Sequence, residues 1–154
     1  MLSREELKEL RTEFWTAFGN LMRPHSSETG FNVRWTNYRT GVKDLFFRLD
    51  MDGKTATIAI DFQHPDDGIR QLFWEQFMEY KTYFHEVTGG EWQYNDLLFT
   101  NDGRPYARVF RIRENVSLYR KETWPDAFAF LKENLLVLDS FWSDVRLTFI
   151  ELSR

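Results

Sequence analysis

The sequence contains no cysteine, and this absence excludes disulfide bonds, thiolate metal ligands and cysteine nucleophiles. A chain without disulfides fits a reducing compartment. The sequence also lacks a glycine-rich phosphate-binding loop, a Gly-x-Ser-x-Gly nucleophile motif and a His-Glu-x-x-His zinc motif. No spacing relates its three histidines to one another. We therefore assign no catalytic residue, no metal site and no cofactor, and we expect a protein that acts by binding.

Long apolar runs are missing as well, and no stretch approaches the length of a membrane-spanning helix. The first residues show no apolar run behind a basic start, so they do not resemble a signal peptide. The formal net charge of −4 argues against a protein that coats nucleic acid with its whole surface. We expect a soluble, cytoplasmic protein without a membrane partner.

Aromatic residues, by contrast, are abundant. They make up 18% of the chain and include three Phe-Trp pairs, at residues 14–15, 73–74 and 141–142. Aromatic side chains bury the largest area per residue, so a short chain can build a thick core with them. The hydrophobic content of 42% and the charged content of 29% are typical of globular proteins. Residues 1–154 are predicted to form a single domain.

The N-terminal segment is predicted to contain one helix and one short strand. Ser3 followed by Glu6 is a capping box, which starts a helix. Apolar residues at helical spacing extend this helix over residues 4–22. Apolar residues then alternate over residues 31–35, which indicates a short strand.

Two hairpins and a helix are predicted for the middle of the chain. Alternating apolar residues pair 45–51 with 56–62 around the turn Asp52-Gly53. The next helix begins at Pro65. The acidic residues that follow it form a first turn that suits the helix dipole. A stripe of apolar residues continues this helix as one piece until Gly89-Gly90. The second hairpin pairs residues 97–100 with residues 106–113.

The last helix carries the most regular pattern, an apolar heptad stripe from Trp124 to Leu152. One helix over residues 125–152 would be roughly 40 Å long, about the full width of a domain with a radius of gyration near ~15 Å. The apolar surface exceeds what one sheet face needs, which suggests a homodimer contact. The alternative is a helix bent or broken near Asp139-Ser140, with both halves in a monomeric core. The candidate contact residues are Leu138, Trp142, Val145 and Phe149.

The order of elements is therefore α-(β)-β-β-α-β-β-α. Hairpin strands with intervening helices predict an α+β fold. We expect a two-layer sandwich, in which helices cover one face of an antiparallel sheet of 4–5 strands.

Charge is distributed unevenly over these elements. Residues 31–48 carry a net charge of +3 and residues 104–121 a net charge of +5, whereas the helices after Pro65 and Trp124 are acidic. If the helices cover one face of the sheet, the open face would be positive. Arginine beside exposed aromatic residues binds phosphates and stacks bases. The alternative is that these arginines pair with the acidic helices or solvate an exposed sheet. The candidate anion-binding residues are Arg34, Arg39, Arg108, Arg111 and Arg113, and the candidate stacking residues are Trp35 and Tyr38.

A second cluster follows the predicted strand 56–62. Asp61 and His64 could form a metal site or a general base there. The simpler interpretation is that Asp66 or Asp67 caps the next helix and that His64 is a loop residue. We prefer the simpler one.

A series of aromatic and structural segments runs through nearly the whole chain. They are residues 13–18, Arg34-Trp35, residues 58–62, Trp92, residues 104–108, Phe130-Leu131 and Phe141-Trp142. In this order they resemble DUF4268, a bacterial family of domains of unknown function. The resemblance implies a bacterial cytoplasmic protein, either alone or as a module of nuclease-like or restriction-associated proteins. It brings no catalytic residues.

The sequence leaves two binding functions open and, as a third hypothesis, a small enzyme that uses Asp61 and His64. The first is binding of nucleic acid or another phosphate-bearing ligand through a basic sheet face. The second is a protein-interaction or homodimerisation module that uses the C-terminal helix, with a restriction- or nuclease-type protein as a further possible partner.

Overall fold

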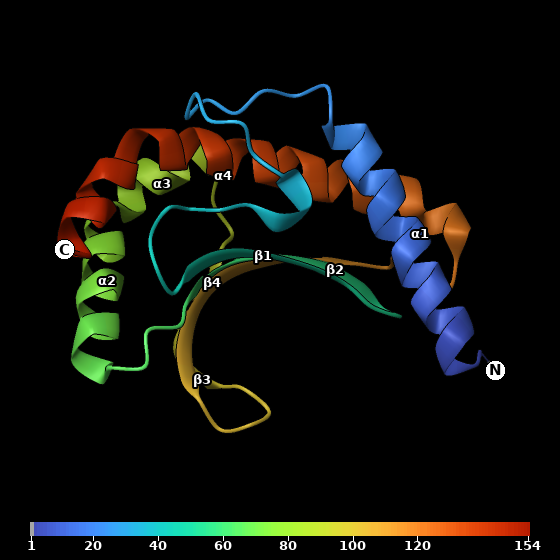
Figure 1. The fold of residues 1–154 in the computed structure, drawn as a ribbon, viewed down its shortest axis with the longest axis horizontal. Coiled ribbons are helices and arrows are strands. Elements are labelled where there is room, and N and C mark those ends of the chain that lie inside the picture. The colour runs from blue at the N-terminus through green and yellow to red at the C-terminus, as the bar shows by residue number, and fades with distance from the viewer. Residues whose placement is uncertain (1) are drawn as a thin grey trace.

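A computed structural model describes residues 2–154, which form four α-helices, two short 3₁₀ turns and a four-stranded sheet. Figure 1 shows the helices on one side of a curved sheet. In chain order the elements are α1 (Arg4–Met22), a 3₁₀ turn (Trp35–Asn37), β1 (Leu45–Met51), β2 (Thr55–Phe62), α2 (Asp67–Glu79), α3 (Lys81–Thr88), β3 (Gln93–Phe99), β4 (Pro105–Glu114), a 3₁₀ turn (Lys121–Thr123) and α4 (Trp124–Leu152).

The sheet has the strand order β1-β2-β4-β3, and every neighbouring pair is antiparallel. Two hairpins therefore lie side by side, joined through β2 and β4 at the centre of the sheet. The predicted α+β class, with an antiparallel sheet of four strands and helices on one face, is confirmed. No helix among residues 2–154 is both long and apolar enough to cross a membrane.

The predicted strand at residues 31–35 is wrong. This segment instead crosses α4 as part of the long loop 23–44, and its end forms a 3₁₀ turn at Trp35–Asn37. The indole N–H of Trp35 donates a hydrogen bond to the carbonyl oxygen of His25, at 3.1 Å. The alternating apolar residues at 31–35 therefore belong to a loop in which Trp35 is buried, and they do not form a fifth strand.

The helix predicted after Pro65 is divided in two at Tyr80, between α2 and α3. The break brings the rings of Phe77 and Phe84 to within 5.0 Å of each other. Both rings also contact Phe141 of α4, at 5.8 Å and 4.9 Å. In a straight helix these two phenylalanines would lie about 10 Å apart along the axis, so the break lets both pack on one residue of α4.

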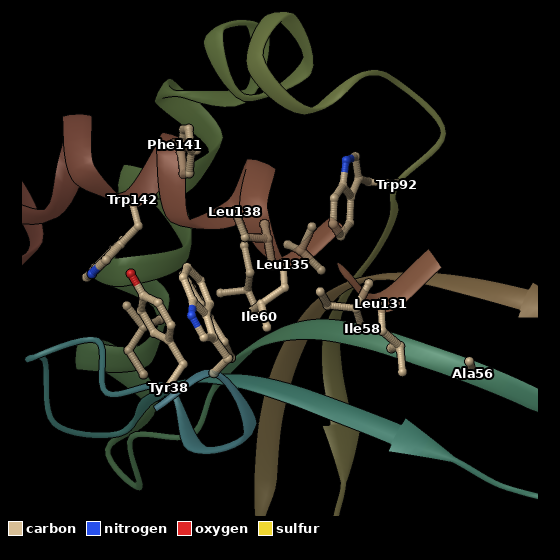
Figure 2. Packing of buried hydrophobic residues seen from close by; sticks show 14 of the residues in the cluster. Tyr38, Ala56, Ile58, Ile60, Trp92, Leu131, Leu135, Leu138, Phe141 and Trp142 are labelled. Carbon is tan, nitrogen blue, oxygen red and sulfur yellow. The ribbon is translucent and has the colours of Figure 1, made fainter. Parts of the chain in front are cut away.

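The helix α4 is continuous over 29 residues, as the heptad stripe predicts, and the alternative of a break near Asp139-Ser140 does not occur. Its apolar stripe lies on the helix-covered face of the sheet. Figure 2 shows Leu131, Leu135 and Leu138 pointing toward Ile58 and Ile60 of β2. These side chains are fully or almost fully buried within one chain, which makes α4 the centre of the core.

The four residues proposed as a dimer contact belong to this same core. Leu138, Trp142, Val145 and Phe149 are at most 3% exposed. The ring of Phe149 stacks on Phe73 of α2. The chain's own sheet, loop and helices therefore cover the surface that we expected a second copy to cover. Homodimerisation stays a prediction, but it would need a different surface.

We predict that Leu135→Ala lowers the free energy of unfolding by about 2–5 kcal/mol, because it removes buried methyl groups and leaves a cavity. Urea unfolding followed by tryptophan fluorescence measures this. The matched control is Leu147→Ala on the same helix, since Leu147 is 66% exposed. The control should change stability by less than about 0.5 kcal/mol. Equal losses in the two variants would contradict the packing of α4.

Candidate functional site

The structure places the five candidate arginines in three separate places. Arg34 and Arg39 lie in the loop that crosses α4, and both are exposed. Side chains alternate along a strand, so Arg111 and Arg113 share the helix-covered side of β4 with the buried Val109, whereas Arg108 faces the open side. The strand arginines and the loop arginines do not form one basic surface.

Arg108 is bound to an aspartate of the neighbouring strand. Its Nε and Nη2 donate hydrogen bonds to the two carboxylate oxygens of Asp61, at 2.7 Å and 2.9 Å. This hydrogen bonding raises the pKa of Arg108. Asp61 is almost completely buried, so the arginine compensates a charge that would otherwise be unpaired. Arg108 therefore has a structural partner already.

The open face of the sheet is consequently not positive. Strand alternation places two basic and three acidic side chains on it. They are Arg48 and Arg108, and Asp50, Asp61 and Glu114. This arrangement differs from the basic sheet face that we predicted. The prediction summed the charge along each segment and did not separate the residues on the two faces of each strand.

We predict that Arg108→Gln lowers the free energy of unfolding by about 2–4 kcal/mol, because the variant leaves the Asp61 carboxylate buried without its charged partner. Chemical unfolding at neutral pH measures this. The matched control is Arg113→Gln on the same strand, where the ion pair with Asp126 is exposed and 3.6 Å long. The control should change stability by less than about 0.5 kcal/mol. If Arg108→Gln lowered the free energy of unfolding by as little as the control does, the structural role of Arg108 would be contradicted.

Arg111 is also fully engaged. Its guanidinium donates to the side-chain oxygen of Asn134 on α4 and to the carbonyl oxygen of Thr88 on α3. It also lies 4.3 Å from the centre of the Trp92 ring. Burial lowers the pKa of Arg111. These contacts join α3, β4 and α4, and they leave little of the guanidinium for a ligand.

The two candidate stacking residues point inward. Trp35 and Tyr38 are 6% and 5% exposed, so neither presents a face on which a base could stack. The ring of Tyr38 instead packs on Phe47 of β1. Sequence could not show this, because a short irregular loop has no periodicity that separates inward from outward side chains.

The loop 23–44 is held on α4 by one buried carboxylate. Asp139 accepts hydrogen bonds from the hydroxyl of Ser27 at 2.6 Å, from the backbone N–H of Glu28 at 2.7 Å and from the hydroxyl of Tyr38 at 2.5 Å. Three donors satisfy the charge that burial would otherwise penalise. An aspartate in the middle of an apolar stripe therefore anchors the loop and does not interrupt the helix.

The pKa of Tyr38 is raised well above its usual value of about 10, chiefly by burial and then by Asp139. Above pH 10 the unfolded chain loses this proton and the native chain keeps it. The native state then binds more protons, so stability must fall as pH rises beyond 10.

We predict that Tyr38→Phe lowers stability by about 1 kcal/mol at pH 7, because one hydrogen bond is lost. The variant should also show a shallower loss of stability between pH 10 and 11 than the unaltered chain. Urea unfolding at several pH values measures both effects. Tyr94, whose pKa burial raises to about 12, is present in both proteins and does not affect the comparison. Parallel pH profiles would refute the role given to Tyr38.

Three arginines from two distant parts of the chain meet in one surface pocket. Arg34 and Arg39 of the loop and Arg146 of α4 line a hollow of about 580 Å³, which we call the arginine pocket. Among the described residues, none that lines it is acidic. None of the three arginines takes part in an ion pair or a side-chain hydrogen bond within residues 2–154. The complete lining is Thr29, Phe31, Asn32, Val33, Arg34, Asn37, Arg39, Thr40, Gly41, Trp142 and Arg146.

Sequence reasoning missed Arg146, because it is one of only two basic residues in an acidic helix. One signal was present: Arg146 follows Trp142 by four residues and so lies on the same face of the helix. The indole of Trp142 donates a hydrogen bond to the carbonyl oxygen of Thr40, at 3.0 Å. This contact seats the loop beside Arg146, but only the folded chain reveals it.

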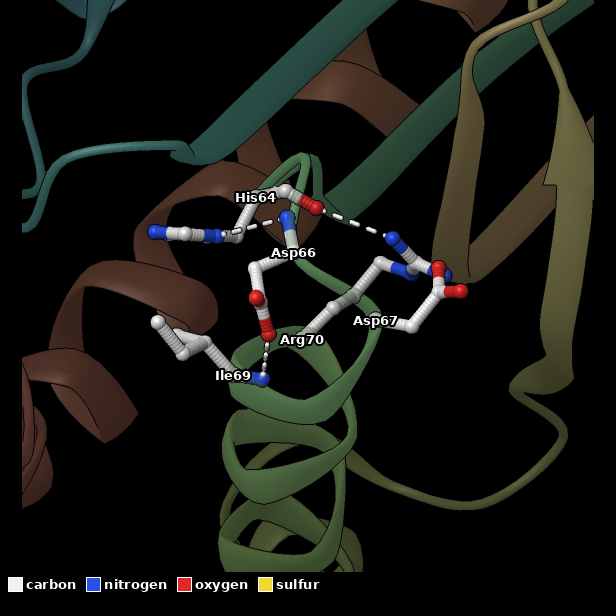
Figure 3. Close-up of polar contacts among 5 residues, drawn as sticks. All are labelled: His64, Asp66, Asp67, Ile69 and Arg70. Carbon is white, nitrogen blue, oxygen red and sulfur yellow. Dashed lines mark hydrogen bonds and ion pairs between the residues drawn. The ribbon is translucent and has the colours of Figure 1, made fainter.

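The second candidate cluster forms the start of α2 (Figure 3). His64 accepts a hydrogen bond from the backbone N–H of Asp66 through its Nδ1, at 3.0 Å. Asp66 caps the helix by accepting from the N–H of Ile69 at 2.9 Å. Arg70 donates to the carbonyl oxygen of His64 and pairs with Asp67. These contacts agree with the simpler interpretation, in which the cluster caps a helix.

Asp61 and His64 do not combine into a site. Asp61 is buried against Arg108, and the hollow beside His64 has a volume of only about 10 Å³ and is not lined by Asp61. Within residues 2–154, no three His, Asp or Glu side chains come together as a metal ion would require.

The family model for a domain of unknown function, DUF4268, matches residues 10–146. The chain belongs to the DUF4268 family. No curated protein and no solved structure matches this chain. The matched range of the DUF4268 domain contains all three arginines of the arginine pocket and also Asp139, which anchors the loop.

Proposed function

We propose that this DUF4268 domain binds a phosphate-bearing ligand in the arginine pocket. The observation that carries the proposal is that Arg34, Arg39 and Arg146 line one hollow, and that no acidic residue in the described chain lines it with them. The planar guanidinium presents several N–H donors in a fork that matches phosphate oxygens. Arginines with structural roles in this chain, such as Arg108 and Arg111, have partners instead.

Electrostatics favours a ligand with more than one negative charge. Guanidinium groups held around one hollow repel each other when no anion lies between them. A phosphate or diphosphate group would replace this repulsion by attraction. The contrast with the rest of the molecule is large, because the whole chain has a net charge of −4. The pocket is therefore a local positive region on an acidic protein.

The remaining walls suit the organic part of such a ligand. The volume of about 580 Å³ lies within the range of small-molecule sites. Phe31 and Val33 provide apolar surface, and Asn32 and Asn37 provide amides that can donate and accept hydrogen bonds. A nucleotide, with its phosphates and flat ring, has this combination. The absence of cysteine supports the proposal of a cytoplasmic setting for it.

We predict that the chain binds inorganic pyrophosphate and adenosine triphosphate in isothermal titration calorimetry at low salt. The double variant Arg39→Gln/Arg146→Gln should weaken this binding at least about tenfold, because charge-assisted hydrogen bonds are lost. Both residues line a pocket on the surface, so the double variant should keep the fold. Circular dichroism checks this.

The matched control is Arg113→Gln/Arg120→Gln, which removes the same charge from exposed positions outside the pocket. The control should bind as the unaltered chain does. Equal weakening in the two double variants would show that only the overall charge matters. Failure of pyrophosphate, adenosine triphosphate and oligonucleotides to bind at low salt would refute the proposed function.

A further inference from the structure

A second pocket lies directly beside the arginine pocket. It has a volume of about 810 Å³ and is formed by the end of α1 and the loop that follows it. Five residues line both pockets, so they form a ridge between the two hollows. They are Phe31, Asn32, Val33, Arg34 and Asn37. The two pockets are therefore neighbouring parts of one grooved surface.

This second pocket is basic as well. Arg23, His25 and Arg34 line it, and again no acidic residue of the described chain does. The guanidinium of Arg23 donates to the side-chain oxygen of Asn20, at 2.7 Å, which is a neutral acceptor and leaves the positive charge uncompensated. Most other lining groups are small hydroxyl and amide side chains, which can bond to phosphate oxygens and sugar hydroxyls.

An exposed aromatic ring stands on the ridge. Phe31 is 57% exposed, although it is a large apolar residue. The guanidinium of Arg146 lies 4.6 Å from the centre of its ring. The guanidinium therefore covers one face of the Phe31 ring, and the exposed part of the ring remains available to a ligand. An aromatic ring between basic hollows is the arrangement on which single-stranded nucleic acids stack their bases.

We propose that the two pockets and the ridge bind single-stranded nucleic acid, an inference that rests on the proposed function. A mononucleotide needs only one of the pockets, whereas a strand carries one phosphate per nucleotide and can place successive phosphates on both sides of the ridge. A flexible strand can follow two hollows with a ridge between them. A duplex is stiff over such distances, and proteins that read it insert convex elements into its grooves.

The test uses fluorescence anisotropy with fluorescein-labelled oligothymidylates of two, six and twelve nucleotides, at increasing salt. We expect affinity to rise about tenfold or more from two to six nucleotides. Arg23→Gln should weaken binding of the six-nucleotide strand about fivefold or more and leave adenosine triphosphate binding unchanged. The slope of log affinity against log salt should become shallower by about 0.7 with each arginine removed.

Phe31 tests stacking separately. Phe31→Leu should weaken strand binding about fivefold or more, and Phe31→Tyr should retain it, because a base stacks on an aromatic ring but not on an aliphatic chain. Arg120→Gln is the matched control for charge, since Arg120 is exposed and lines neither pocket. It should leave the affinity for the strand unchanged.

The outcomes separate this inference from the proposed function. If adenosine triphosphate binds through Arg39 and Arg146 but longer strands bind no tighter and Arg23→Gln has no effect, the inference fails and the proposed function stands. If neither class of ligand binds at low salt, both fail. Binding of poly-glutamate as tightly as a strand of equal charge, or equal affinities of Phe31→Leu and Phe31→Tyr, would also overturn the inference.

Discussion

The burial of one face of α4 is the constraint on which the rest of the structure depends. This helix of 29 residues contacts the sheet through its leucines, the helices α2 and α3 through Phe141 and Phe149, and the loop 23–44 through Trp142. Burial of apolar surface is the largest favourable contribution to folding. Because α1, α2, α3 and β2 all pack on this one helix, a chain of modest length forms a single core.

Polar contacts then decide what the surface of that core presents. The carboxylate of Asp139 binds the loop at three points, and the indole of Trp142 binds it at a fourth. The loop lacks regular secondary structure over most of its length, so these contacts replace the hydrogen bonds of a strand or helix. They place Arg34 and Arg39 beside α4. The same helix that organises the core thus also builds the arginine pocket.

The arginines of this domain divide into two classes by their partners. Arg108 and Arg111 bind an aspartate, an asparagine and backbone carbonyl oxygens, and they join elements of the fold. Arg34, Arg39 and Arg146 have no such partner among residues 2–154 and surround a hollow. Arginine content alone does not separate these classes. What separates them is whether the guanidinium is available to a ligand, because a group that is already fully hydrogen-bonded gains little from binding an anion.

The sequence by itself determined the elements whose signals are local. The capping box at Ser3 and Glu6, the alternation in the first hairpin and the heptad stripe of α4 all follow from spacing within one element. The α+β class followed from their order. The first strand of the second hairpin was predicted at residues 97–100 and instead spans Gln93–Phe99, where a bulge interrupts its pairing with β4. The boundary between α2 and α3 did not follow from local signals. It lies at Tyr80, whose ring packs on the ring of Phe141 in α4.

Only the tertiary structure decided which basic residues lie together. Arg34 and Arg146 are distant in the sequence and meet because the loop folds over α4. Trp35 and Tyr38 turn inward for the same reason, and Phe31, which alternation had placed in a strand, turns outward. Periodicity reports which side of an element is buried, but it does not report which other element covers that side. A site assembled from a loop and a distant helix therefore leaves no local pattern.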